Sequence, residues 1–285
     1  LIRETTLFVI VSKTFTTQET LSNTNTLIKW FLNHAPESAI SNHFIAVSTN
    51  LEKVTEFGIS AENIFPMNDW VGGRFSLWST VGLSICLAIG PKNFEDLLQG
   101  AGKMDQHFRK ADFKENIPVI LALITVWYNN FWEVETEAII PYSQYLRNLP
   151  AYLQQAIMES NGKRVDRNGK AVDYQTGNII WGASGTNAQH AFFQLMHQGT
   201  KMIPADFIGF AKPLHEGNDH QDKLMSNFFA QTQALMQGKS AETVREELTQ
   251  QGKSQEQIEA LLPFKVFEGN RPSNTLFIEQ LTPAN

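Results

Sequence analysis

Hydroxyl groups and one cation directly follow a short apolar segment near the start of the chain. Leu7 to Val11 are apolar and predict a buried parallel strand, and residues 12–14 are serine, lysine and threonine. Thr16 and Glu19 have the spacing of a capping box, which predicts a helix start. Free N–H groups there, with hydroxyls and an ammonium, can bind a phosphate. Ordinary helix capping explains the same pattern without a ligand, and no glycine-rich Walker or Rossmann spacing accompanies it.

Paired glycines and an arginine form a second candidate. Gly72 and Gly73 allow the backbone to approach a ligand closely, and the guanidinium of Arg74 would face that ligand. A Gly-Gly turn with a surface arginine is the alternative interpretation.

A glutamate near a helix end is the third candidate. Gln155 and Glu159 are four residues apart on a helix expected over 143–160, so they share one face. The neighbouring Met158 and the helix stop at Asn161-Gly162 favour a partly buried carboxylate that could act as a base. A solvated surface glutamate is the alternative.

Histidines form the last group of candidates. His190 lies in the first turn of a helix expected over 187–198, where an imidazole can act as acid or base or be buried as a structural group. His197 lies on roughly the same face, so we considered metal binding, but no third ligand has suitable spacing. His215 and His220 are one residue too far apart for a zinc helix, and Gly217 disfavours that helix, so we reject a metal site there.

Short apolar segments alternate with segments of helical spacing, which predicts parallel sheets flanked by helices. The expected strands are 7–11, 44–48, 64–66, 138–141, 179–181, 202–210 and 275–280. The expected helices are 18–32, 80–89, 94–108, 118–131, 143–160, 187–198, 223–237, 241–251 and 254–262, the last opened by a capping box of Ser254 and Gln257. We therefore expect an α/β fold with two doubly wound parallel-sheet lobes in three layers, the first lobe incomplete. We place the lobe boundary near Pro91.

Composition limits the class of protein. The 285 residues, 42% of them hydrophobic and 18% charged, suffice for two globular cores. The net charge of −6 lacks the basic surface of a nucleic-acid binder. The longest apolar segments, 81–89 and 119–127, are shorter than the roughly 20 residues that span a bilayer, so we expect buried helices and no membrane association. Cys86 is the only cysteine, which excludes an internal disulfide, and we expect a core thiol in a cytoplasmic protein.

Four segments, in this order, resemble motifs of the phosphoglucose isomerase family. They are SKTFTTQET at 12–20, VGGRFSLWS at 71–79, MESNGK at 158–163 and GTNAQHAF at 185–192. The resemblance extends over nearly all of the chain. It implies two sugar-isomerase lobes with the site between them. Residues 1–90 would be the latter part of the smaller lobe, and residues 91–285 the connecting helices and most of the larger lobe.

The resemblance also implies an activity, the reversible isomerisation of glucose 6-phosphate and fructose 6-phosphate through ring opening and a cis-enediol intermediate. The residues that match the phosphate-binding set are Ser12, Lys13, Thr14 and Thr17. Glu159 would move the proton between C2 and C1, Arg74 would stabilise the developing negative charge, and Gln155 would line the sugar pocket. His190 would help to open the ring, reaching the site from the neighbouring subunit of a homodimer. No metal or organic cofactor is implied, since a carboxylate base with a fixed cation can perform this shift.

The chain departs from the family pattern at its ends. Both ends lie close to core strands, so we expect material missing on both sides. On the resemblance, a Gly-Gly-Ser phosphate loop precedes Leu1, and a catalytic lysine with a nearby glutamine follows Asn285. We therefore expect this segment alone to bind sugar phosphate weakly and to turn over slowly or not at all. A non-catalytic sugar-phosphate regulator on the same fold is the alternative, but it would have little reason to combine Glu159, Arg74 and His190.

Overall fold

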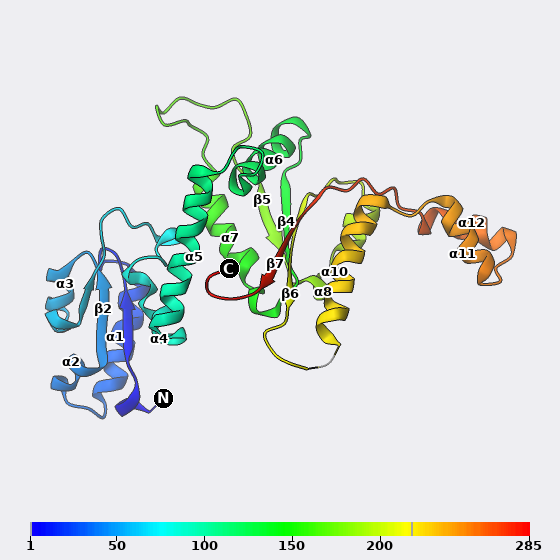
Figure 1. Ribbon diagram of the computed structural model, residues 1–285. Helices are drawn as coiled ribbons and strands as arrows, with labels where there is room; N and C mark the ends of the chain where they lie inside the picture. Colours follow the sequence, from blue (N-terminus) through cyan, green and yellow to red (C-terminus); the bar gives the residue numbers. More distant parts are fainter. Residues whose placement is uncertain (1, 218) are drawn as a thin grey trace. The chain divides into compact units, whose positions relative to one another are not determined.

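The computed structural model describes residues 2–217 and 219–285, which form two compact units, each built on a parallel β-sheet (Figure 1). This arrangement confirms the predicted α/β fold class with two parallel sheets. The first unit extends to Ala101 and includes Ala284, and the second contains Gly102–Pro283 and Asn285. Because this division falls inside helix α5 (Pro91–Lys110), the lobes assigned to 1–90 and 91–285 stay predictions.

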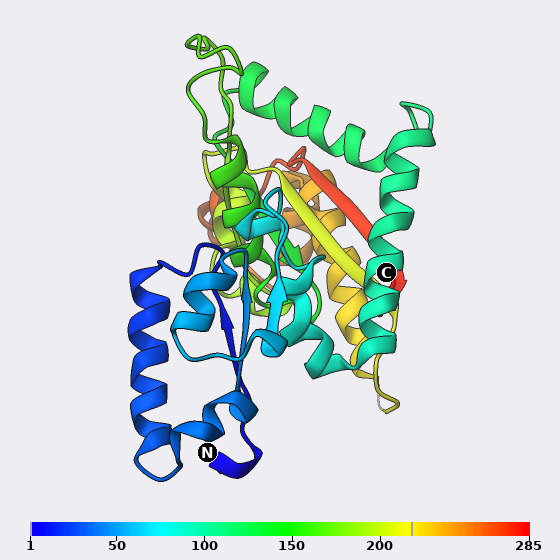
Figure 2. The ribbon, with the colours of Figure 1, turned by 90° about the vertical axis from the view of Figure 1, so that its left-hand side faces the viewer.

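The first unit contains a sheet of three parallel strands. In sheet order these are β1 (Phe8–Val11), β2 (Phe44–Ser48) and β3 (Ile64–Pro66). Its helices are α1 (Gln18–Leu32), α2 (Ile40–His43), α3 (Leu51–Glu56), α4 (Leu83–Ile89) and the beginning of α5. Phe8 pairs with Phe44 in the parallel register, and both side chains pack with Phe31 of α1 and Val54 of α3. Alternation along the strands places this core on one face of the sheet, next to α1 (Figure 2).

The second unit contains a sheet of four parallel strands with helices on both faces. The strands, in sheet order, are β5 (Ile179–Gly182), β4 (Thr136–Pro141), β6 (Ala205–Lys212) and β7 (Ser273–Gln280). Ala138 and Ile140 of β4 join the core formed with α8 (Gly185–Gln189), α9 (Phe193–Gln198) and α10 (His220–Gln237). Ile139 points to the opposite face and packs with residues of α7 (Leu149–Leu153). The sheet is therefore the middle of three layers.

Two helices that we expected to be buried are largely exposed. Leu87 of α4 and both Leu123 and Trp127 of α6 (Ile117–Phe131) have more than half of their side-chain surface accessible. Hydropathy predicted these two helices correctly. The prediction that they are buried was wrong, because no element among the described residues covers these faces. None of the described helices is long and apolar enough to cross a membrane.

Three expected helix boundaries also differ. The helix expected over 143–160 is divided into a 3-10 turn at Gln144–Leu146, then α7, then a π-helix at Gln154–Glu159. The helix expected over 187–198 is divided into α8 and α9. The helix expected over 94–108 begins earlier, at Pro91 of α5, since proline fits the first position of a helix.

Helices α11 (Ala241–Gln250) and α12 (Gln255–Lys265) form a hairpin that stands apart from the sheet of the second unit (Figure 1). The hairpin has its own apolar cluster around Val244, Leu248 and Ile258. Ser254 and Gln257 form the predicted capping box at the start of α12, which is therefore confirmed.

A partly buried polar network lies at the amino-terminal edge of the second sheet. Glu137 of β4 accepts hydrogen bonds from Asn178 Nδ2 at 2.6 Å and from Thr125 Oγ1 at 3.2 Å. Asp206 of β6 hydrogen-bonds to Glu137 and accepts one from Asn274 Nδ2 at 2.8 Å. Two carboxyl groups thus share one network.

Candidate functional site

The predicted phosphate-binding residues lie together in the turn between β1 and α1. Ser12 is buried, and its hydroxyl donates to Thr17 Oγ1 at 3.4 Å. Thr17 is the N-cap residue of α1, but its side chain makes no capping hydrogen bond. The first N–H groups of a helix have no partner within the helix, so they remain suited to an anion.

The capping box predicted for this helix is wrong. The N-cap position is Thr17 and not Thr16, and the Thr16 hydroxyl pairs with the hydroxyl of Thr14 at 2.6 Å. Thr14, Thr16 and Thr17 are all exposed, so their hydroxyls can contact a ligand.

Phe15 fixes the backbone of this turn. It has a φ of +52°, a conformation that costs free energy in a residue other than glycine. Its side chain is buried against Phe57, with ring centroids 5.4 Å apart, and this packing holds the strained backbone in place. Successive backbone N–H groups around a left-handed residue can form a concave site for an anion.

Residues at the carboxyl end of β2 hydrogen-bond to the turn. The carbonyl oxygen of Lys13 accepts hydrogen bonds from Ser48 Oγ at 3.0 Å, Thr49 Oγ1 at 2.6 Å and Thr49 N at 2.9 Å. Sequence reasoning did not assign Ser48 and Thr49 to the site. The available signal was that both are polar residues at the carboxyl end of the strand that follows β1.

The loop that contains Arg74 belongs to the same unit and is joined to the turn. Lys13 Nζ donates to the carbonyl oxygens of Asp69 at 2.5 Å and Val71 at 3.0 Å. Arg74 is half-buried, with its guanidinium carbon 5.9 Å from the centre of the Phe75 ring. A Cβ added at Gly72 would meet no heavy atom within 4 Å, so open space lies beside the loop. The structure thus brings Arg74 and the phosphate-binding turn into one unit.

Gln155 and Glu159 both lie on the π-helix of the second unit. Its hydrogen bonds join residues five apart, and such π-turns are frequent at functional sites. Gln154 Nε2 donates to the Ile180 carbonyl of β5 at 3.0 Å and so fixes the π-helix against the sheet. Gln155 and Glu159 are exposed, so the expectation that the carboxylate is partly buried is wrong in this chain.

His190 lies just beyond α8 and not in the first turn of a helix, as we had expected. Its N–H donates to the Asn187 carbonyl at 3.1 Å, and its side chain is exposed, which excludes the buried structural role. Tyr142 positions α8: Gln189 Nε2 donates to the Tyr142 hydroxyl at 3.3 Å, and burial raises the pKa of Tyr142 to about 12. A Cβ at Gly185 would lie 2.4 Å from the Tyr142 ring, so only glycine fits there.

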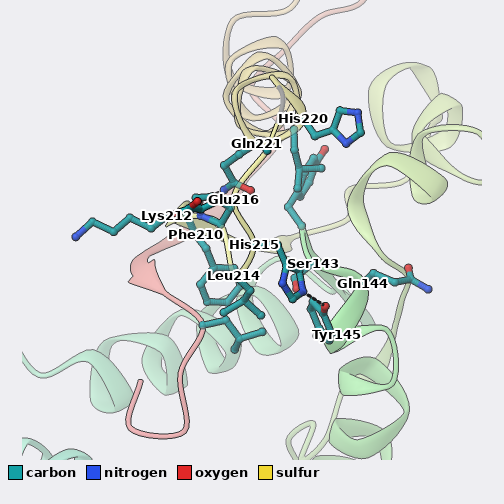
Figure 3. A pocket seen from close by; sticks show the side chains of 15 residues that line it. Ser143, Gln144, Tyr145, Phe210, Lys212, Leu214, His215, Glu216, His220 and Gln221 are labelled. Carbon is teal, nitrogen blue, oxygen red and sulfur yellow. Dashed lines mark hydrogen bonds between the residues drawn. The ribbon is translucent and has the colours of Figure 1, made fainter.

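His197 and His215 each make a side-chain hydrogen bond outside the predicted site. His197 Nε2 lies 2.8 Å from Gln231 Oε1, and the ring packs edge-on against Phe193 and Phe267. His215 Nε2 lies 2.7 Å from the Tyr145 hydroxyl in a cavity of about 340 Å³ (Figure 3). This cavity lies at the carboxyl ends of β4 and β6, and none of the predicted site residues lines it.

The two parallel sheets with their helices place the chain in the α/β class. The family model "Phosphoglucose isomerase" matches residues 1–285, so the chain belongs to the phosphoglucose isomerase family. It is 67% identical over 280 residues to a glucose-6-phosphate isomerase of Christiangramia forsetii, covering 98% of this chain and 52% of that protein. The chain therefore spans about half the length of this curated relative.

Two solved structures are similar over the whole chain. The crystal structure of a glucose-6-phosphate isomerase from Chlamydia trachomatis has a TM-score of 0.83 and 36% identity, and this chain covers 52% of it. A hypothetical protein from Thermus thermophilus has a TM-score of 0.73 at 24% identity, with 63% of its length covered, and supports the fold alone.

Proposed function

We propose that the protein interconverts glucose 6-phosphate and fructose 6-phosphate. Family membership over residues 1–285 and the relative at 67% identity support this reaction class. The observation that carries the proposal is the hydroxyl-lined turn at the start of α1 with the loop of Arg74 hydrogen-bonded to it. Such a pairing fits a substrate that presents a phosphate at one end and develops negative charge at the other.

Each residue then has a physical role. Ser12, Thr14 and Thr17, with the N–H groups of the turn, bind the phosphate, and Lys13 adds positive charge. Glu159 accepts the proton from one sugar carbon and returns it to the next, which a carboxylate can do when substrate binding excludes water from it. In this proposal Gln155 lines the sugar pocket. Arg74 stabilises the enediolate charge.

Ring opening requires a further acid or base, and we assign it to His190. In this proposal the protein is a cytoplasmic homodimer, and His190 enters the site of the neighbouring subunit. The exposed side chain of His190, beyond the end of α8, is available for such a contact.

The test is the rate of fructose 6-phosphate isomerisation by the natural full-length protein and its Glu159→Gln variant. Glutamine preserves the shape of the side chain but removes the base, so kcat should fall at least about 1,000-fold. Binding of glucitol 6-phosphate, which cannot isomerise, should change by less than about threefold.

Glu246→Gln is the matched control, because Glu246 is an exposed glutamate on α11 outside the proposed site. It should leave the rate unchanged. A natural protein that binds glucitol 6-phosphate but does not isomerise fructose 6-phosphate would contradict the proposal and favour the regulator.

A further inference from the structure

The side chain of Lys13 is hydrogen-bonded to a loop far away in the sequence. Its ammonium donates to the carbonyl oxygens of Asp69, at 2.5 Å, and Val71, at 3.0 Å. Lys13 is half-buried, unlike the exposed Thr14 beside it. Two of the three ammonium donors are therefore already used by backbone oxygens, and they point toward the loop.

The backbone hydrogen bonds given for the loop are local. Val71 N donates to the Asn68 carbonyl at 3.0 Å, Phe75 N to the Gly72 carbonyl at 3.1 Å and Ser76 N to the Gly73 carbonyl at 3.3 Å. Asp69 and the paired glycines are exposed, and glycines give the chain the greatest conformational freedom. A cross-link at Val71, three residues before Arg74, therefore restricts where the guanidinium can lie.

The other end of Lys13 is fixed as well. Its carbonyl oxygen accepts three hydrogen bonds from Ser48 and Thr49 at the end of β2. The residue thus connects the end of β2, the phosphate-binding turn and the loop of Arg74. A lysine whose main task was to contact phosphate would direct its ammonium at the ligand.

We propose that Lys13 is a positioning residue, whose ammonium holds the 69–74 loop so that Arg74 meets the reaction intermediate. The inference rests on the proposed function. The proposal changes the expected role of Lys13. Its ammonium affects turnover through Arg74. Its backbone N–H group and the neighbouring hydroxyls bind the phosphate. Lys13 still contributes positive charge to the turn, so a small effect on binding is expected.

The test is Lys13→Met in the natural full-length protein, since methionine keeps the apolar stem and removes the donors. We expect kcat to fall about 10- to 100-fold, because a loosened loop misplaces Arg74. The dissociation constant of glucitol 6-phosphate should rise less than about threefold. Lys29→Met, at a lysine on α1 outside the proposed site, is the matched control and should change neither quantity.

A double-mutant cycle with Arg74→Met separates the positioning role from direct phosphate binding. If Lys13 acts through Arg74, the double variant is no slower than Arg74→Met alone, within about threefold. Two results would overturn the proposal. One is a double variant whose loss in kcat equals the product of the two single losses. The other is a rise of 10-fold or more in the dissociation constant of glucitol 6-phosphate for Lys13→Met with kcat unchanged. An inactive wild-type protein would instead refute the proposed function.

Hydrogen exchange provides a readout that does not depend on activity. The amides of 69–76 should exchange faster in Lys13→Met, while those of α1 stay as protected as in the wild type. If that variant does not fold, Lys13→Arg takes its place, because its guanidinium can reach both carbonyls in altered geometry. For Lys13→Arg, a loss in kcat smaller than that expected for Lys13→Met, with binding unchanged, would support the proposal. Weaker binding of glucitol 6-phosphate with kcat unchanged would overturn it.

Discussion

At the residue scale, the carboxyl pair of Asp206 and Glu137 makes stability depend on pH. Burial, and then the charge of Glu137, raises the pKa of Asp206 to about 7, from 3.8 for an isolated aspartate. Between these pH values the folded chain keeps a proton that the unfolded chain has released. The free energy of unfolding therefore decreases as the pH rises from about 4 to about 7, and it stays low above that range.

We expect Asp206→Asn to remove this dependence. An asparagine can still accept the hydrogen bond of Asn274 and can donate one to Glu137. The free energy of unfolding at pH 8 should rise by roughly 2 kcal/mol, after allowance for the partial exposure of both carboxyl groups, and change little at pH 4. Thermal unfolding from pH 4 to pH 8 measures this change.

Asp173→Asn, in an exposed loop, is the control and should keep the slope of the wild type. A variant at Asp206 that loses stability with pH as steeply as the wild type would show that this carboxyl group is not responsible.

Site residues could be predicted from the sequence where the residues that form the pattern are close together in the chain. Ser12 and Thr17 follow an apolar strand directly, so one stretch of sequence contains their pattern. Ser48 and Thr49 support the same turn but belong to the next strand, and only the parallel pairing of β1 with β2 brings them to Lys13. Sequence reasoning that treats each motif separately cannot find such a contact.

At the element scale, the α11–α12 hairpin should respond to changes as an independent part of the second unit. Its helices pack on their own apolar cluster, and Arg245 joins Glu259 across the hairpin at 3.0 Å. The Oγ atom of Ser254 accepts from Gln257 N at 3.3 Å, and Gln257 Oε1 accepts from Ser254 N at 3.1 Å. This capping box stabilises the start of α12.

Ser254→Ala should therefore destabilise the hairpin locally. Loss of an N-cap costs about 1 kcal/mol, which corresponds to about fivefold faster amide exchange over 255–262. Exchange in β4 and β6 should not change. The neighbouring Lys253→Ala has no cap to lose and should leave 255–262 as in the wild type; equal exchange in both variants would contradict the capping role.

Helices were predicted well where their hydrogen bonding is regular and poorly where it changes. Periodicity predicted α1 and α10 within a few residues but treated 143–160 as one helix. The π-turn at 154–159 depends on contacts such as that of Gln154 with the Ile180 carbonyl, 26 positions away, and side-chain spacing does not reveal it. Similarly, hydropathy predicted α6 but not its exposed Trp127, because burial depends on what covers a helix.

At the scale of the whole molecule, the proposed roles are divided between the two units. The phosphate-binding turn and Arg74 belong to the first unit, while Glu159 and His190 belong to the second. Neither unit has the complete set, so the proposed reaction needs both. The proposed dimer adds one more requirement, because the His190 of one subunit would complete the site of the other.

Complementation between inactive subunits tests this last requirement. Glu159→Gln and His190→Asn homodimers should each lose at least about 100-fold in rate. In a mixed dimer, co-expressed with two affinity tags and purified through both, one site would contain both substitutions and the other would contain neither. The mixed dimer should then regain about half of the wild-type rate.

The mixed dimer of Glu159→Gln with wild-type subunits is the control for assembly, and it should also show about half of the wild-type rate. If His190 served its own subunit, every site of the doubly mutant dimer would contain one substitution. Its rate would then be as low as that of the two homodimers, and the assignment of His190 to the neighbouring site would be wrong.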